Sequence, residues 1–220
     1  MRWYTRRDLL AARPAAPAGA ILFAGEPVGE TVALGLDEWA VAEELSREAL
    51  RGCGLRSGDR VLLALEQPGA PSTALLARAA APLVHSVAMT GARGRMRLLT
   101  AIRTLKPTVL ILTPCGAADL LARLYMEFNV DPVELGIERI VIGGEIDTAG
   151  LRKRLAREFE ADVAELYLDP FFGLPLAWRL GGGWRQAAPG TLALAAVDRD
   201  EIGSEDLAAD LEEAEIVLRP

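Results

Sequence analysis

Short apolar runs alternate with amphipathic segments along most of this 220-residue chain. Residues 61–65 and 108–112 are almost entirely aliphatic or β-branched, as in strands covered by helices on both faces. In residues 117–128 and 148–159, apolar side chains return every three or four positions, which is the helical period. Strands that are joined by helices usually lie parallel in one sheet. This alternation of strand-like and helix-like segments therefore predicts an α/β fold with a mainly parallel sheet flanked by helices.

The sequence changes character after residue 170. Gly181-Gly182-Gly183 predicts a hairpin turn, because glycine accepts the backbone angles that tight turns require. Residues 191–197 and 216–218 are strand-like, and residues 205–214 have the pattern of an acidic helix. We therefore expect an α/β body over residues 1–170 and a small β-rich appendage over residues 171–220.

Composition excludes several classes of protein. The chain is 51% hydrophobic and 25% charged, with a formal charge of −7, so neither nucleic acid nor an anionic membrane is an expected partner. The two cysteines are Cys53 and Cys115, which provide no metal-ligand spacing and suit a reducing, cytoplasmic location. The single histidine, His85, lies in an apolar segment, which predicts a hydrogen-bonded core residue.

As partners we expect a small-molecule ligand and either a second copy of this chain, in a homodimer, or a different partner chain.

The N-terminus admits two interpretations. Arg6-Arg7 could begin a twin-arginine export signal. Such a signal needs an uninterrupted apolar segment, which Arg13, Pro14 and Pro17 break here. We therefore expect a short polar helix and a proline-containing linker that lead into the first strand.

Four segments carry motifs in a defined order. They are Thr5-Arg6-Arg7-Asp8-Leu9, Gly54-Leu55-Arg56-Ser57-Gly58-Asp59-Arg60-Val61, residues 97–114, and Asp131-Pro132 followed by residues 139–145. In this order they resemble segments of the phenylacetate–coenzyme A ligase family of AMP-forming, adenylate-forming enzymes. The resemblance covers most of residues 1–170 and implies the fold of that family's large N-terminal domain. It also implies that the family's mobile C-terminal domain has no counterpart in this chain.

Residues 23–31 match the phosphate-binding loop of that family, S-S-G-T-T-G-K-P-T. Gly25, Gly29 and Thr31 keep the pattern, but the lysine is missing. Glu26 and Glu30 bring negative charge instead, and each would repel a nearby triphosphate by about 1 kcal/mol. We expect a degenerate phosphate loop, and the alternative is a plain β-turn.

The family's Y-G-x-S/T-E motif aligns with residues 167–171. The resemblance implies that Tyr167 borders an adenine, but Phe171 stands where the family has its magnesium-binding glutamate. A phenyl ring cannot ligate a hard cation, so we assign no metal site, although Asp169 could substitute from the same strand face.

Gly143-Gly144-Glu145 corresponds to the family's G-G-E motif at a strand end. Glycines there allow a ligand to approach the backbone, and open α/β sheets bind ligands at such ends. With Tyr167 they form a candidate adenine or acyl pocket. In the alternative interpretation the glycines only turn the chain into the next helix.

Together these observations predict a degenerate ligase-like protein that cannot adenylate on its own and retains a small-molecule or nucleotide pocket. No residue is assigned a catalytic role and no cofactor is assigned, although the resemblance makes ATP, AMP or coenzyme A the candidates. One alternative is half of a two-chain acyl-CoA ligase. The other is a dimeric interaction or scaffold protein that binds no ligand.

Overall fold

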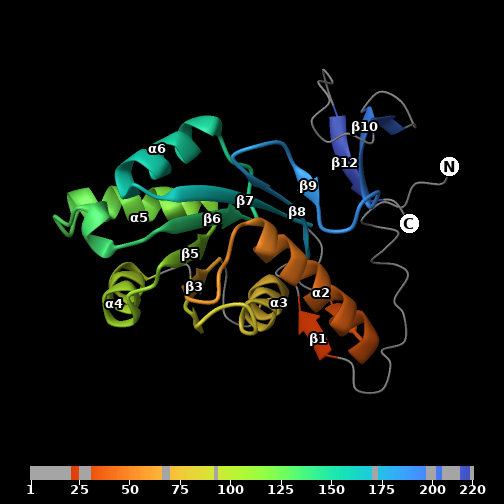
Figure 1. The fold of residues 1–220 in the computed structure, drawn as a ribbon, viewed down its shortest axis with the longest axis horizontal. Coiled ribbons are helices and arrows are strands. Elements are labelled where there is room, and N and C mark those ends of the chain that lie inside the picture. The colour runs from red at the N-terminus through yellow and green to blue at the C-terminus, as the bar shows by residue number, and fades with distance from the viewer. Residues whose placement is uncertain are drawn as a thin grey trace.

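The computed structural model describes residues 21–24, 31–65, 70–91, 94–169, 173–196, 202–204 and 214–218. Its centre is a seven-stranded sheet in the order β4-β3-β5-β6-β7-β8-β9. Figure 1 labels β3 and β5 to β9 of this sheet. The first five strands in this order are parallel, and β8 and β9 are added antiparallel. The bounds are β3 Arg60–Ala64, β4 Ser86–Met89, β5 Val109–Leu112, β6 Arg139–Gly143, β7 Asp162–Leu168, β8 Pro175–Leu180 and β9 Arg185–Gln186. The predicted α/β fold with a mainly parallel sheet is confirmed.

Helices cover both faces of this sheet. They are α2 Leu36–Gly52, α3 Pro71–Ala80, α4 Arg95–Leu105, α5 Pro114–Met126 and α6 Ala149–Phe159, with a 3-10 turn, η1, at Pro132–Leu135. Apolar residues of α2 and α3 pack on one face, against Val61, Leu63 and Ile111. Those of α4, α5 and α6 pack on the other face, against Leu62 and Leu110. Successive residues of a strand therefore point to opposite faces and pack into two different cores, which explains why the strands are apolar throughout.

Two smaller β units accompany the main sheet. β1 Ile21–Ala24 and β2 Thr31–Leu34 form an antiparallel pair. β10 Leu192–Ala196, β11 Ile202–Ser204 and β12 Ala214–Leu218 form a three-stranded sheet, and Leu192 packs against Leu176 and Ala177 of β8. The predicted glycine hairpin joins β8 to β9, so the main sheet continues beyond residue 170. The expected acidic helix lies almost entirely at residues 205–213, outside the described residues.

In the sequence, Asp37 is the expected N-cap of α2, and Val41, Leu45 and Ala49, which repeat every four residues, are its expected buried face. Gly35 caps the helix instead, and its amide donates to Glu38 Oε2 at 2.8 Å. Of the three residues expected on the buried face, Ala49 is buried and Leu45 is half-buried, but Val41 is 62% exposed, so this face is predicted only in part. The buried face of α2 consists of Trp39, Ala42, Ser46, Ala49 and Leu50. Apolar character alone did not identify this face, because its central residue is a serine that donates to the Ala42 carbonyl.

His85 also departs from the prediction. Its side chain is exposed, just before β4, and its backbone amide donates to the Asp59 carbonyl at 2.9 Å. The prediction of a core histidine was wrong because β4 is the last strand of the sheet and has no neighbour on its outer side among the described strands.

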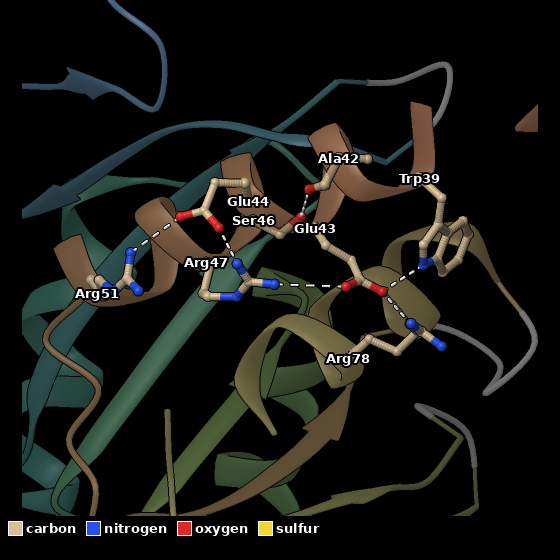
Figure 2. Close-up of polar contacts among 8 residues, drawn as sticks. All are labelled: Trp39, Ala42, Glu43, Glu44, Ser46, Arg47, Arg51 and Arg78. Carbon is tan, nitrogen blue, oxygen red and sulfur yellow. Dashed lines mark hydrogen bonds and ion pairs between the residues drawn. The ribbon is translucent and has the colours of Figure 1, made fainter. Parts of the chain in front are cut away.

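A polar cluster around Glu43 joins α2 to α3 (Figure 2). Glu43 accepts hydrogen bonds from Trp39 Nε1, at 2.5 Å, and from Arg78 of α3. Arg47 lies 3.6 Å from the other carboxylate oxygen, and Arg78 also lies over the Trp39 ring, 5.6 Å from its centre. Burial alone would raise the pKa of Glu43, but these hydrogen bonds and positive charges outweigh it and lower the pKa below 4.5.

This lowered pKa predicts a pH-dependent contribution to stability. An acid with a depressed folded-state pKa stabilises the fold above its unfolded pKa, and the contribution disappears as pH falls through the folded value. We expect wild type to lose more unfolding free energy than Glu43→Gln as pH falls from about 5 to about 3. Urea titrations at each pH measure the difference. Equal losses in the two proteins would contradict the assignment.

Candidate functional site

The strand order identifies the edge at which a ligand is expected. β4 follows β3 on one side and β5 lies on the other, so the direction of winding reverses at β3. Open α/β sheets bind ligands outside the carboxyl ends of the strands, next to such a reversal. The carboxyl edge of this sheet includes the residues at or directly after the ends of β4, β5 and β6, which are Thr90, Thr113 and Gly143-Gly144.

The helix α5 begins at this edge directly after β5. Thr113 is its N-cap, and the Thr113 hydroxyl accepts the Gly116 amide at 3.0 Å. The helix therefore directs the amide of Cys115 and its positive dipole end toward the loop that follows β6.

Glu145 occupies that position. Gly144 has a φ of +83°, which lets the chain turn sharply after β6, and Glu145 Oε2 then accepts the Cys115 amide at 2.9 Å. A carboxylate of the protein thus fills the first turn of α5, where helix N-termini commonly bind phosphates. The site as built presents a hydrogen-bond acceptor and a negative charge.

Glu145 also acts on the side chain of Cys115. A hydrogen bond to Glu145, together with the charge of that carboxylate, raises the pKa of the Cys115 thiol. A helix N-terminus alone would lower it. The exposed thiol is therefore held in its protonated form, which is the weaker nucleophile.

Beyond Glu145 a second group of charges holds the same loop. Asp147 lies 2.9 Å from Arg152 Nε of α6, and Arg152 lies 3.1 Å from Glu165 of β7. Glu165 also accepts a hydrogen bond from Arg179 of β8 at 2.5 Å, and Arg179 lies over the Trp184 ring. The Glu165 and Asp147 side chains are 7% and 8% exposed. The loop after β6 is therefore fastened to α5 on one side and to α6 and β7 on the other.

This second group was missed in the sequence. A signal did exist, since Glu165 and Arg179 are charged residues inside strand-like apolar runs. Their pairing depends on the antiparallel register of β7 and β8, in which Glu165 lies opposite Arg179. That register is a tertiary property that spacing alone does not reveal.

Gly143 has a steric role that requires no ligand. It pairs with Leu166 of β7, and a Cβ on Gly143 would lie 2.9 Å from the Leu166 carbonyl oxygen. Close packing of two strands therefore accounts for this glycine. Gly144 and Glu145 follow at the open edge and are exposed.

Tyr167 lies near the carboxyl end of β7, the strand next to β6. Its ring packs with Leu176, Ala177 and Leu192, and burial, followed by the charge of Asp169, raises its pKa. Tyr167 and the G-G-E loop thus come to the same edge on adjacent strands. Among the described residues no hydrogen bond joins Tyr167 to Glu145.

The remaining predicted residues are placed as follows. Asp169 is 3% exposed and accepts the Leu174 amide at 2.9 Å, so it closes the turn between β7 and β8. Phe171, Gly25 and Gly29 lie outside the described residues. Thr31 begins β2 opposite Ala24, and its side chain is not described. The described part of the chain contains no group of three or more His, Cys, Asp or Glu residues placed to hold a metal ion.

A hollow of about 580 Å³ lies at the opposite, amino edge of the sheet. It is lined by Val133, Gly136, Ile137, Glu138, Ala156, Phe159, Glu160, Ala161 and Asp162. Three of these residues are acidic, which suits neither phosphates nor carboxylates. Within the described ranges, no helix combines the length and the apolar character that crossing a bilayer requires.

Comparison with known proteins shows where this fold occurs. No family model and no curated protein matches the sequence. Solved structures do match, and they include AMP-forming acyl-CoA ligases of the adenylate-forming superfamily at 14% to 20% identity. The chain spans less than half the length of these structures. The similarity shows a ligase-like fold, and the narrower resemblance to phenylacetate–CoA ligases stays a prediction.

Three of these structures illustrate the match. A 2-hydroxyisobutyryl-CoA ligase in complex with 2-HIB-AMP is 19% identical with a TM-score of 0.72, covering 90% of this chain and 46% of that one. A benzoate CoA ligase from Burkholderia xenovorans is 14% identical with a TM-score of 0.59, and the match covers 76% of this chain and 35% of the ligase. An o-succinylbenzoate CoA synthetase from Bacillus subtilis is 15% identical with a TM-score of 0.56, and the match covers 91% of this chain and 40% of the synthetase.

Proposed function

We propose that this protein is a degenerate relative of the acyl-CoA ligases that binds a small molecule or nucleotide at the carboxyl edge of its sheet and does not adenylate on its own. The observation that carries the proposal is the contact between Glu145 and the Cys115 amide. A triphosphate would have to displace this carboxylate from α5 or accept its repulsion. Glu26 and Glu30, the two acids in the segment that resembles a phosphate loop, would also repel a triphosphate.

The same arrangement favours a ligand that donates hydrogen bonds. The exposed Glu145 carboxylate can accept from an amino or hydroxyl group. Tyr167 supplies an aromatic ring on the neighbouring strand. An adenosine group, which carries an exocyclic amine and a flat ring, combines both requirements, and a single phosphate on it could extend into solvent.

A melting-temperature screen tests the proposal. A ligand that binds only the folded state stabilises it by about 2.7 kcal/mol at one hundred times its Kd. We expect adenosine or AMP to raise the Tm and magnesium-ATP to raise it less. Glu145→Gln should diminish the adenosine effect and reduce the penalty on ATP, because it removes the charge. Glu134→Gln, which alters an exposed acid on η1, is the matched control.

Two results would overturn the proposal. If adenosine, AMP, ATP, coenzyme A and aryl acids all leave the Tm unchanged, the protein is a scaffold that lacks a ligand of this class. If magnesium-ATP gives the largest shift and Glu145→Gln does not change it, the carboxylate does not exclude triphosphate.

A further inference from the structure

The two ends of the seven-stranded sheet are protected differently. β9 at one end has only two residues, one of which is the exposed Arg185. β4 at the other end lies next to β3, and no described strand lies beyond it. Edge strands of soluble proteins usually carry charges or proline, which prevent pairing with another chain. The sequence from Leu83 to Gly91 contains no charged residue other than the titratable His85, and no proline.

The hydrogen bonds to β3 define which backbone groups of β4 have no partner among the described strands. The Ser86 amide donates to Asp59 at 3.3 Å, and the Thr90 amide donates to Leu63 at 2.9 Å. In a parallel pair, alternate residues direct both their amide and their carbonyl to the same neighbour. Val87 and Met89 therefore direct their amides and carbonyls away from the sheet.

The side chains at this edge suit an apolar partner. Met89 is 48% exposed, although it lies in a strand of the main sheet. Val87 lies on the same face of β4 and is only partly buried. Ala88, between them, faces the other side and packs against the core that contains α4.

We propose that β4 pairs antiparallel with β4 of a second copy of this chain, about a twofold axis at Ala88. Val87 and the partner's Met89 would exchange two backbone hydrogen bonds, and the symmetric pair would exchange two more. Each exposed Met89 would then cover the partner's Val87, and Ser86 would lie opposite the partner's Thr90. Apolar pairs stabilise cross-strand contacts, and no like charges are opposed. A twofold contact uses the same edge of both chains and leaves no further copy of that edge exposed, so a dimer forms and not a fibre.

The register gives a sharp test by cross-linking in a Cys115→Ser background, which removes the exposed native thiol. Ala88 would face the partner's Ala88 as a pair without hydrogen bonds, with Cα atoms about 4.5 Å apart, which a disulfide can bridge. We expect Ala88→Cys to give a covalent dimer under mild oxidation. Val87→Cys, the matched control, would face the partner's Met89 and should give none.

Sedimentation of the full chain supplies a second measurement. Wild type should have twice the mass of one chain, and Met89→Lys should be a monomer that retains the wild-type Tm when measured at a concentration where wild type is also monomeric. Lysine is suitable because the Met89 side chain is exposed and takes no part in the bond ladder to β3. A monomeric wild type would overturn the proposal. A dimer that persists in Met89→Lys, or equal cross-linking of the two cysteine variants, would also overturn it.

Discussion

Gly52→Ala is expected to lower the free energy of unfolding by about 3 kcal/mol, the upper part of the range for overpacked cores. A Cβ on Gly52 would lie 2.0 Å from Cε2 and 2.1 Å from Nε1 of Trp178. The Trp178 ring is part of the core between α2 and the sheet and is 8% exposed, so it has no free space into which to move. The added methyl group would separate α2 from β8. Urea denaturation measures the loss.

Gly58→Ala is the matched control, because a Cβ on Gly58 meets no atom within 4 Å. It should change stability by no more than about 0.5 kcal/mol. Trp178→Leu in the Gly52→Ala background should recover part of the loss, since the smaller side chain leaves room for the methyl group. Equal effects of Gly52→Ala and Gly58→Ala would show that α2 and β8 are not packed as described.

Glu165→Ala should cost about 3 kcal/mol, as is typical when one partner of a buried ion pair is removed. Burial raises the pKa of Glu165 even though Arg179 and Arg152 oppose the shift, so the cost of burying this carboxylate exceeds what its two arginines return. The loss in Glu165→Ala comes from the two arginines, whose side chains are only 28% and 25% exposed. Among the described residues, Arg152 would keep Asp147 as an ion-pair partner and Arg179 would keep none. Glu165→Gln keeps an acceptor and should cost less.

Glu44→Ala provides the comparison. Glu44 also contacts two arginines, Arg47 and Arg51, but its side chain is 59% exposed on α2. Exposed ion pairs contribute little, so this variant should lose no more than about 1 kcal/mol. If thermal or urea unfolding gives Glu165→Ala and Glu44→Ala the same stability, the buried group of charges does not hold the sheet to α6.

The fold could be predicted from the sequence to a large extent, because its strands are buried on both faces. A continuous apolar run such as residues 108–112 has few other uses in a chain of this composition. The end of α4 was equally predictable, because Pro107 cannot continue a helix and stands just beyond Leu105, where the helix ends. The face of α2 was not predictable, because Trp39 and Ser46 become buried through contacts with other elements.

The candidate site was predictable only in part. Gly144 and Glu145 could be identified from a short motif, and the structure places them at the carboxyl edge as expected from the sheet topology. The contact between Glu145 and the Cys115 amide joins residues thirty positions apart and depends on where α5 begins. No local pattern encodes that distance. The same holds for the group around Glu165, which β7, β8 and α6 assemble together.

Isotope exchange between pyrophosphate and ATP tests most directly whether this fold still forms an acyl adenylate. The reaction requires a bound triphosphate, and label from pyrophosphate enters ATP only when adenylation occurs and is reversed. With a panel of aryl and short-chain acids and magnesium, the purified chain should give no exchange above the rate without protein. Exchange above that rate with any one acid would contradict the account, because it would mean that the negatively charged edge accommodates the triphosphate.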